Sequence, residues 1–314
     1  MKLVILEPLG VAKKTLLNMV QKAVNGRMEV AAYDTRAENV PTLIERSRDA
    51  DIVVLSNFAY RREVMEHCPN LKMVCVAFTG VDHVDLEYCK ERGITVCNCA
   101  GYSTAAVSDL VFAMVLALAR RIISCNEAVR SGNTKEGLVG FELEGKKFGV
   151  IGTGAIGLRT AKIAQAFGCE VYAYSRTKKE IPGITYVELD TLLSTCDIVS
   201  LHVPHTSDTE GLINAEKLAL MKPSAILINT ARGPIVDSAA LSNALKTGKL
   251  AGAGVDVFEM EPPIPMDHPL MFAPNLIASP HVGFATQQAM KKRAAIVCSN
   301  LAGWLDGKPQ NVIV

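Results

Sequence analysis

The chain has 314 residues, of which 49% are hydrophobic, and its 33 Lys and Arg residues nearly balance its 32 Asp and Glu residues. This length allows two domains with separate cores, and a near-neutral charge without a basic stripe argues against a nucleic-acid-binding protein. The apolar runs at residues 3–6 and 107–119 are too short for a signal sequence or a membrane span, so we expect a cytoplasmic protein.

The first hundred residues alternate short apolar runs with segments of helical periodicity. We expect strands at residues 2–6, 28–32, 51–55, 72–77 and 95–97. Between them, helices are expected at residues 12–24, 41–48, 61–67 and 85–92. Such alternation predicts an α/β fold with a parallel sheet covered by helices on both faces.

A long helix is expected next, at residues 103–123 with Ser103 as its N-cap, and a polar stretch separates it from a second alternating unit. Strands of that unit are expected at residues 147–151, 170–174, 198–201, 225–229, 251–256 and 276–278. The final helix, at residues 286–305, is expected to cross back and complete the first lobe. The predicted domains are therefore residues 1–98 with 285–314, and residues 99–284.

The second unit opens with a glycine-rich loop between a predicted strand and a predicted helix. Its sequence is Gly152-Thr153-Gly154-Ala155-Ile156-Gly157. Gly152 permits a tight turn, Gly154 lets the backbone approach a pyrophosphate, and Gly157 lets the helix pack closely on the strand. Because the loop has this strand-to-helix context, it predicts a dinucleotide-binding site.

The next strand ends in Ser175-Arg176-Thr177, followed by Lys178 and Lys179. Enzymes that use NAD usually carry an acid at this point, which holds the ribose 2′-hydroxyl. A guanidinium and a hydroxyl would instead bind a 2′-phosphate. The sequence therefore favours NADP(H), with NAD(H) as the alternative if Arg176 only stacks on adenine.

Nine cysteines are scattered along the chain without a CxxC pair. This spacing favours reduced thiols over disulfides, and we expect no metal site.

A cation, an acid and a histidine, which together suit a hydride-transfer enzyme, follow predicted strands or turns. Arg232 can clamp a carboxylate with its planar guanidinium and polarise the adjacent carbonyl. His281 can supply a proton, and an ionised Glu261 can stabilise the protonated imidazole. We therefore expect Arg232, Glu261 and His281 to be catalytic, with Arg232 and His281 also contacting the substrate.

The other histidines have simpler explanations. His202 is expected to pack or hydrogen-bond at a strand end, and His205 to line a cleft. Surface or loop positions are expected for His67, His83 and His268.

Taken together, the motifs resemble those of NAD(P)-dependent D-2-hydroxyacid dehydrogenases over essentially the whole chain. Besides the glycine loop, they are Phe78-Thr79-Gly80-Val81-Asp82, Leu201-His202-Val203-Pro204, Asn229-Thr230-Ala231-Arg232-Gly233, Asp256-Val257-Phe258 with Glu261-Pro262, and Ser279-Pro280-His281. The Ser-Arg-Thr sequence is similar to that of glyoxylate and hydroxypyruvate reductases. The chain departs from common family patterns at Ala100, Ser108-Asp109 and His205, which leaves the substrate open.

The resemblance implies a Rossmann cofactor domain inserted in a flavodoxin-like substrate domain, and a homodimer formed through the long helix region. It also implies roles for individual residues. The backbone N–H groups of Thr79 and Gly80, beside Phe78, would hold the substrate carboxylate, and Asp256 would accept from the nicotinamide carboxamide. Further cofactor contacts are implied for Thr104, His202, Val203, Pro204, Thr209, Thr230, Ala231 and Gly283.

Relatives that act on phosphorylated hydroxyacids tend to carry an Arg near Leu55-Ser56-Asn57, where this chain has neutral residues, although Arg61 and Arg62 lie slightly further on. We therefore expect a small unphosphorylated keto acid, with glyoxylate and hydroxypyruvate leading. Two alternatives are a dinucleotide-sensing, corepressor-like binding protein and a dehydrogenase of an inorganic anion such as phosphite.

Overall fold

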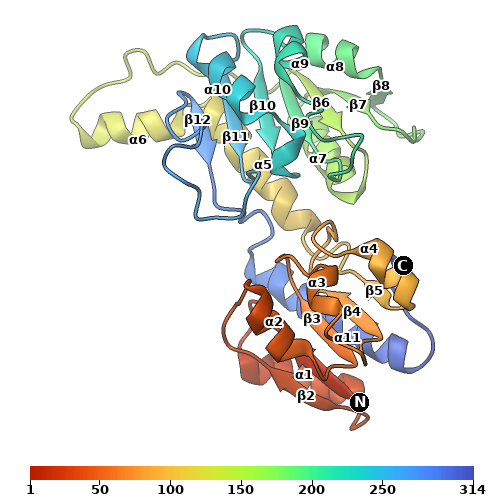
Figure 1. The fold of residues 1–314 in the computed structure, drawn as a ribbon. Helices are drawn as coiled ribbons and strands as arrows, with labels where there is room; N and C mark the ends of the chain where they lie inside the picture. Colours follow the sequence, from red (N-terminus) through yellow and green to blue (C-terminus); the bar gives the residue numbers. More distant parts are fainter. The chain divides into compact units, whose positions relative to one another are not determined.

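The structure, a computed structural model, describes residues 1–314 and divides into two compact units (Figure 1). Unit 1 consists of Met1–Ser103 and Ala285–Val314, and unit 2 of Thr104–Phe284. The chain therefore passes from one unit to the other after Ser103 and after Phe284. The boundaries predicted from the sequence lie after residues 98 and 284.

Unit 1 contains a five-stranded parallel sheet of order β2-β1-β3-β4-β5. Its strands are β1 (Lys2–Ile5), β2 (Glu29–Ala32), β3 (Ile52–Leu55), β4 (Met73–Val76) and β5 (Thr95–Cys97). This is the flavodoxin-like order, in which ligands bind beyond the carboxyl ends of the strands. Strands β3 and β4 are buried throughout, because helices cover both faces.

The helices of unit 1 are α1 (Lys13–Val24), α2 (Val40–Ser47), α3 (Arg62–Met65), α4 (Leu86–Arg92) and α11 (Gln287–Leu305). Asn39, Asp85 and Thr286 cap α2, α4 and α11 with side-chain oxygens that accept a backbone N–H of the first turn. Helix α11 packs against α1, so the last helix does return to the first lobe, as the sequence predicts.

Unit 2 contains a seven-stranded parallel sheet of order β12-β11-β10-β9-β6-β7-β8. Its strands are β6 (Lys147–Ile151), β7 (Glu170–Tyr174), β8 (Ile184–Tyr186), β9 (Ile198–Leu201), β10 (Ile226–Asn229), β11 (Gly252–Val255) and β12 (Leu276–Ala278). The strand order reverses between β9 and β6, as in a Rossmann fold. The expected α/β class, with two doubly wound parallel sheets, is confirmed.

The helices of unit 2 are α5 (Thr104–Ala119), α6 (Ile122–Arg130), α7 (Ala155–Ala166), α8 (Leu189–Thr195), α9 (Ala215–Leu220), α10 (Ser238–Lys246) and the 3₁₀ turn η1 (Gly233–Ile235). One core layer lies between the sheet and α8 to α10, and a second lies between the sheet, α5 and α7.

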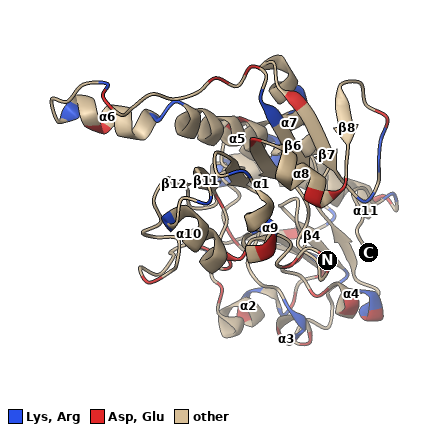
Figure 2. Ribbon diagram, turned by 90° about the horizontal axis from the view of Figure 1, so that it is seen from above, with Lys and Arg blue, Asp and Glu red and all other residues tan.

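The prediction of a single long helix at residues 103–123 is wrong, because the structure has two helices there. Arg121 takes a left-handed conformation with φ 51°, which ends α5 and starts the separate helix α6. No residue of α6 is buried, and the helix extends away from the sheet of unit 2 in both ribbon views (Figures 1 and 2). Hydrophobic periodicity alone could not locate this break, because apolar residues continue through Ile122 and Ile123.

Basic and acidic residues are interspersed along both units (Figure 2). No helix is long and apolar enough to cross a membrane. All nine cysteines are free thiols, seven of them buried. No three His, Cys, Asp or Glu side chains gather in a way that could hold a metal ion.

Candidate active site

The residues predicted for chemistry and cofactor binding line one edge of the unit 2 sheet. Because all strands are parallel, their carboxyl ends lie at the same edge. From one end of this edge, His281 follows β12, Glu261 follows β11, Arg232 follows β10, His202 follows β9, the glycine loop follows β6 and Ser175 follows β7. The three predicted catalytic residues therefore come from three adjacent strands, next to the predicted dinucleotide site.

The glycine loop has a geometry that suits a pyrophosphate. Gly152 has φ 98°, and a Cβ atom there would lie 2.6 Å from the His202 carbonyl oxygen. A Cβ on Gly157 would lie 2.0 Å from the Gly152 oxygen, so only glycine lets α7 pack this closely. At Gly154, by contrast, a Cβ would meet no atom within 4 Å. The loop therefore leaves open space beside the N-terminus of α7, where an anion binds favourably.

Two buried hydroxyls also fit the binding of a dinucleotide. Thr153 Oγ1 and Thr230 Oγ1 are buried, and neither has a hydrogen-bond partner. Buried polar atoms are almost always paired, so an unpaired hydroxyl suggests a ligand or a water at that place. Thr153 lies in the glycine loop and Thr230 precedes Arg232, both at the carboxyl edge of the sheet.

The cations after β7 differ in what they contact. Arg176 is highly exposed, and its Nη1 lies 3.8 Å from Asp208 Oδ2. Lys178 pairs with Glu188 at 3.4 Å. Lys179, however, reaches back to the glycine loop and donates to the Thr153 carbonyl oxygen at 3.0 Å. The sequence showed a basic run but could not indicate which of these cations lies over the loop.

His202 lies at the strand-order reversal, where β9 meets β6. Its Nε2 is 2.9 Å from Ser200 Oγ, so the expectation of a hydrogen bond at a strand end is confirmed. Desolvation of the imidazole lowers the pKa of His202 to about 3, which keeps the ring neutral near pH 7. The neighbouring loop is held together by Thr209, whose Oγ1 donates to the Pro204 carbonyl and accepts from the Thr206 N–H.

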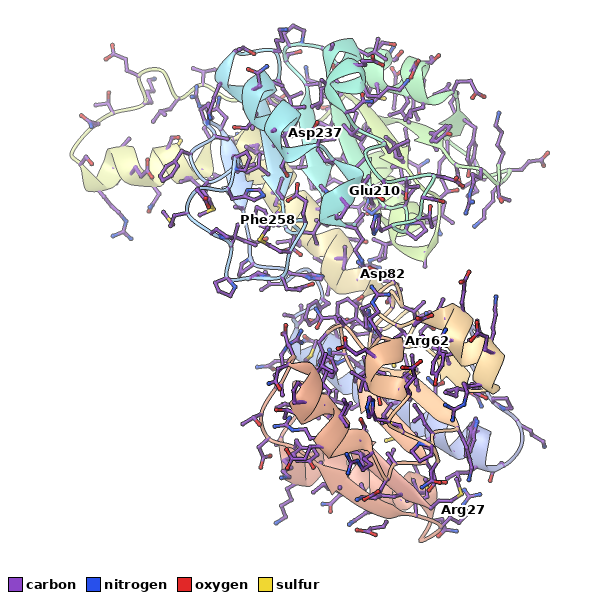
Figure 3. All side chains as sticks on the ribbon, viewed as in Figure 1. Arg27, Arg62, Asp82, Glu210, Asp237 and Phe258 are labelled. Atoms are coloured by element: carbon purple, nitrogen blue, oxygen red, sulfur yellow. The ribbon has the colours of Figure 1, made fainter.

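Arg232 lies on an extended residue between β10 and η1. The side chain of Asn229, almost fully buried, accepts from the Ala231 N–H and donates to the Arg232 carbonyl at 2.9 Å. A Cβ on the next residue, Gly233, would lie 1.9 Å from the Phe258 carbonyl carbon, so the loop of Arg232 packs directly on the loop after β11. Figure 3 labels Phe258 on that second loop, which also carries Glu261.

His281 and Glu261 form a close pair. The imidazole Nδ1 lies 2.8 Å from Glu261 Oε1 and 3.0 Å from Oε2. The side chain of His281 is 12% exposed and that of Glu261 is 42% exposed. His281 also has φ 55°, a left-handed conformation that costs a non-glycine residue about 1–3 kcal/mol and is common at functional sites. Nδ1 faces the Glu261 carboxylate, and Nε2 lies on the opposite side of the ring.

Asp256 holds the turn that carries His281. Its carboxylate accepts from the Ser279 hydroxyl, from the Val282 N–H at 2.9 Å and from the Gly283 N–H at 2.7 Å. These bonds occupy three of the roughly four acceptor positions of a carboxylate. A role toward the nicotinamide remains a prediction, but the structure adds a positioning role that sequence alone did not suggest.

His268 lies in a loop, as expected, but its side chain is buried. Its side chain is 6% exposed, its Nε2 lies 2.9 Å from Glu259 Oε2, and its Nδ1 accepts from the Leu270 N–H at 3.3 Å. Desolvation opposes ionisation of Glu259, but hydrogen bonds from Ser238 and His268 outweigh it and hold the pKa of Glu259 below its usual value. This pair closes the loop that presents Glu261. The contact between Glu259 and His268 was not predicted from the sequence, because the two residues meet only when the loop folds back.

In unit 1, the predicted carboxylate-binding residues Phe78, Thr79 and Gly80 follow β4. Near the end of β3, Arg36 Nη1 donates to Asn57 Oδ1 at 2.8 Å. A cation therefore does reach the loop that appeared neutral in sequence. Arg36 also pairs with Glu7 at 2.9 Å and with Glu38, so two carboxylates offset its charge. Arg36 consequently offers no excess positive charge for a phosphate.

Thr104 is the first residue of α5, and its carbonyl accepts from Ser108 Oγ at 2.8 Å.

A cavity of about 520 Å³ lies near the far end of α5 and the amino ends of β10 to β12, on the opposite edge of the sheet from the predicted site. Its lining includes Leu118, Ile123, Phe141 and Leu276.

Comparison with known proteins agrees with this geometry. The family model described as D-isomer specific 2-hydroxyacid dehydrogenase, NAD binding domain, matches residues 112–283. A glyoxylate reductase of Thermococcus litoralis is 42% identical over 294 residues, covering 89% of this chain and 88% of that protein. A hydroxypyruvate reductase of Blautia hydrogenotrophica is 40% identical over 298 residues, covering 91% and 92%.

A solved acyclic imino acid reductase in complex with NADPH and D-Arg superposes with a TM-score of 0.92 at 30% identity, and the match covers 100% of both chains. Because these relatives are named as reductases, neither the corepressor-like nor the phosphite alternative is favoured. The chain belongs to the D-2-hydroxyacid dehydrogenase family, whose members are NAD(P)-dependent oxidoreductases that act on CH–OH groups.

Proposed function

We propose that the protein reduces a small unphosphorylated 2-keto acid, glyoxylate or hydroxypyruvate, to the corresponding 2-hydroxy acid. The observation that carries the proposal is the His281–Glu261 pair, which follows β12 and β11, beside Arg232, which follows the next strand, β10. The names of the relatives at 42% and 40% identity support these two substrates. Neutralisation of Arg36 by Glu7 and Glu38 supports an unphosphorylated one.

In the proposed mechanism, the guanidinium of Arg232 binds the substrate carboxylate and polarises the carbonyl. Bound NAD(P)H supplies the hydride. His281 donates a proton from Nε2 to the carbonyl oxygen, while Glu261 accepts from Nδ1–H and stabilises the charged imidazole before transfer. Asn229 and Asp256 hold the backbones of Arg232 and His281 in place. The N–H groups of Thr79 and Gly80 are proposed as further donors to the carboxylate.

We also propose that the preferred cofactor is NADP(H). Ser175, Arg176 and Thr177 stand where an acid would select NAD, and Lys179 adds an ammonium group beside Thr153. Gly152, Thr153, Gly154, Ala155, Ile156 and Gly157 would hold the pyrophosphate. Thr230 and Ala231 would face the nicotinamide half, together with Asp256, Gly283 and Thr104. His202, Val203, Pro204 and Thr209 would lie between the two halves.

A homodimer is proposed through the region of α5 and α6. Ile122, Ile123, Val129 and Val139 are 54%, 48%, 76% and 87% exposed, although all four are apolar. Contiguous exposed apolar residues usually mark an interaction surface. The scattered spacing of the nine cysteines, without a CxxC pair, supports the proposal that the protein works in the cytoplasm.

The deciding experiment is a panel of 2-keto acids assayed with NADPH and NADH in parallel. Glyoxylate, hydroxypyruvate, pyruvate and 3-phosphohydroxypyruvate are the informative substrates. The proposal expects the highest kcat/KM for glyoxylate or hydroxypyruvate with NADPH. A clear preference for the phosphorylated acid would refute the substrate assignment, and an absence of turnover with every acid would refute the function.

A further inference from the structure

In unit 1, two successive peptide groups after β4 are held by one neighbouring segment. The Phe78 carbonyl accepts from the Cys99 N–H at 2.8 Å. The Thr79 carbonyl accepts from the side chain of Asn98, whose Nδ2 lies 2.7 Å away. Both donors belong to the two residues that directly follow β5, and β5 pairs with β4.

This arrangement determines where two N–H groups point. Both peptides are trans, because the chain's one cis peptide is Pro262-Pro263. In a planar trans peptide the N–H is directed opposite to the carbonyl. With the Phe78 and Thr79 carbonyls held by residues 98 and 99, the N–H groups of Thr79 and Gly80 therefore both face away from that segment. Neither N–H donates a hydrogen bond within the chain. Successive N–H groups with a common direction form a concave anion site.

Asn98 is in turn braced by residues from the end of the chain. Asn300 on α11, which is fully buried, donates from Nδ2 to the Asn98 carbonyl at 2.8 Å. Its Oδ1 accepts from Asn311 Nδ2 at 2.8 Å, and the Asn311 carbonyl accepts from the Asn98 N–H at 3.1 Å. The last residues also form an antiparallel bridge, Cys97 with Val312. Three asparagines therefore link the C-terminal segment to the Thr79 carbonyl.

We propose that Asn98, braced by Asn300 and Asn311, is a positioning residue that orients the N–H groups of Thr79 and Gly80 toward the carboxylate of the keto acid. This inference rests on the proposed function, since the carboxylate is that of its substrate. Asn98 acts through the Thr79–Gly80 peptide and does not itself contact the substrate. Binding of the keto acid consequently depends on the last segment of the chain.

The first test variant is Asn98→Asp, which is nearly isosteric. It keeps the Oδ1 that accepts from the Ala100 N–H at 3.2 Å, but replaces the donor to Thr79 with a second oxygen. Two oxygens repel at that distance, so the peptide should turn and misdirect the Gly80 N–H. We expect KM for glyoxylate to rise about 10- to 150-fold, the range of one hydrogen bond to a charged group. The Kd of NADPH should stay within about twofold of wild type, because unit 2 carries the proposed cofactor residues.

The second variant is Asn300→Asp, which keeps the acceptor for Asn311 and loses the donor to the Asn98 carbonyl. It should raise KM in the same direction by a smaller factor. The matched control is Ser299→Ala, which removes another bond between α11 and the C-terminal segment, to Gln310 at 3.1 Å, without touching the asparagines. The control should leave KM unchanged.

Two readouts distinguish positioning from stability. If the Asn98 and Asn300 variants lower the melting temperature but keep the wild-type KM, Asn98 is only structural and the proposal is overturned. If Asn98→Asp does not fold, the melting temperature and KM of Asn300→Asp alone decide between the two roles. Equilibrium binding of oxalate provides a probe without turnover. Should the wild type bind oxalate but reduce no keto acid, the proposed function fails, and weaker oxalate binding by Asn98→Asp still supports the inference.

Discussion

His281 combines three constraints in one residue. Its Nδ1 is held by Glu261, its N–H donates to the Asp256 carbonyl at 2.8 Å, and its backbone is left-handed. A ring held this firmly presents Nε2 in one direction, which a general acid requires because proton transfer depends on heavy-atom distance.

The first prediction is that His281→Ala lowers kcat/KM for keto-acid reduction about 10²- to 10⁴-fold, the usual contribution of general acid catalysis. Glu261→Gln, which keeps an acceptor but removes the charge, should cause a smaller loss in kcat. Steady-state kinetics with a parallel measurement of NADPH binding checks both, and binding should be nearly unchanged. His67→Ala, at an exposed position, is the control. Turnover near wild type in His281→Ala would falsify the assignment.

The second prediction concerns Arg232. Arg232→Lys keeps the charge but loses the planar fork, so it should raise KM for the keto acid and also lower kcat. Loss of one charge-assisted hydrogen bond corresponds to roughly 10- to 150-fold in kcat/KM. The same substitution at the exposed Arg48 should have no effect on kinetics. Unchanged keto-acid kinetics in Arg232→Lys would mean that another group binds the carboxylate.

The third prediction tests the cations beyond β7. Ser175→Asp combined with Arg176→Ala should reverse a preference for NADPH, because a carboxylate would replace the groups that we propose bind the 2′-phosphate. Lys179→Met should weaken NADPH more than NADH, since its ammonium lies 3.0 Å from the Thr153 carbonyl. Lys178→Met is the matched control, because that side chain pairs with Glu188 instead. A wild type that favours NADH in kcat/KM would show the cofactor proposal to be wrong.

At the scale of elements, the two sheets share one arrangement of hydrogen bonds at their amino edges, in which a carboxylate accepts from a strand N–H and from a lysine. Asp51, just before β3, accepts from the Lys2 N–H of β1 at 2.8 Å and from Lys72 Nζ at 2.8 Å. Asp197, just before β9, accepts from the Lys147 N–H of β6 at 2.9 Å and from Lys222 Nζ at 2.8 Å. In each unit one carboxylate joins the starts of adjacent strands. No sequence repeat reveals this correspondence, because it consists of isolated residues.

The fourth prediction follows from these carboxylates. Desolvation opposes ionisation of both, but the hydrogen bonds from lysine and backbone N–H hold each pKa below the ordinary value of 3.8. Their stabilisation is therefore present above about pH 4 and is lost as the pH falls through the folded-state pKa. Asp51→Asn and Asp197→Asn should each lower the free energy of unfolding by about 1–2 kcal/mol at pH 7 and by much less near pH 3.

Urea unfolding at the two pH values, with Asp49→Asn as control, checks this prediction. Asp49 is 74% exposed and lies 4.0 Å from Lys2, so its replacement should change stability little. Equal destabilisation of Asp197→Asn at both pH values would show that packing, rather than charge, accounts for the effect.

At the scale of the whole molecule, α6 packs little within its own unit. None of its residues is buried, and an isolated helix of this length is marginal in water. A helix that buries nothing in its own chain is explained if a second copy covers it, as proposed above.

The fifth prediction is that the protein is a dimer and that Ile122→Asp with Val129→Asp converts it to a monomer. Two charges on a surface that becomes buried carry a large desolvation penalty. Light scattering coupled to size-exclusion chromatography measures the mass directly. Ile313→Asp, at a residue 40% exposed in unit 1, is the control and should remain dimeric. A monomeric wild type, or a double variant that stays dimeric, would rule out this surface.

Sequence by itself determined the two α/β lobes, most strand positions, the dinucleotide loop and the order of Arg232, Glu261 and His281. These features depend on local periodicity, on glycine geometry and on motifs that stay contiguous in the chain. The carboxyl-edge location of the site also follows from sequence, because strands connected through helices are parallel.

Only the tertiary structure decided which distant residues meet. Several of these contacts join residues 9 to 26 positions apart: Lys179 with Thr153, Glu259 with His268, Arg36 with Asn57, and Asn98 with Thr79. The contact between Asn98 and Asn300 joins residues 202 positions apart. Such pairs depend on strand order and loop closure, which no local pattern encodes. The break at Arg121 is of the same kind, because apolar residues on both sides continue a helical pattern that the backbone abandons.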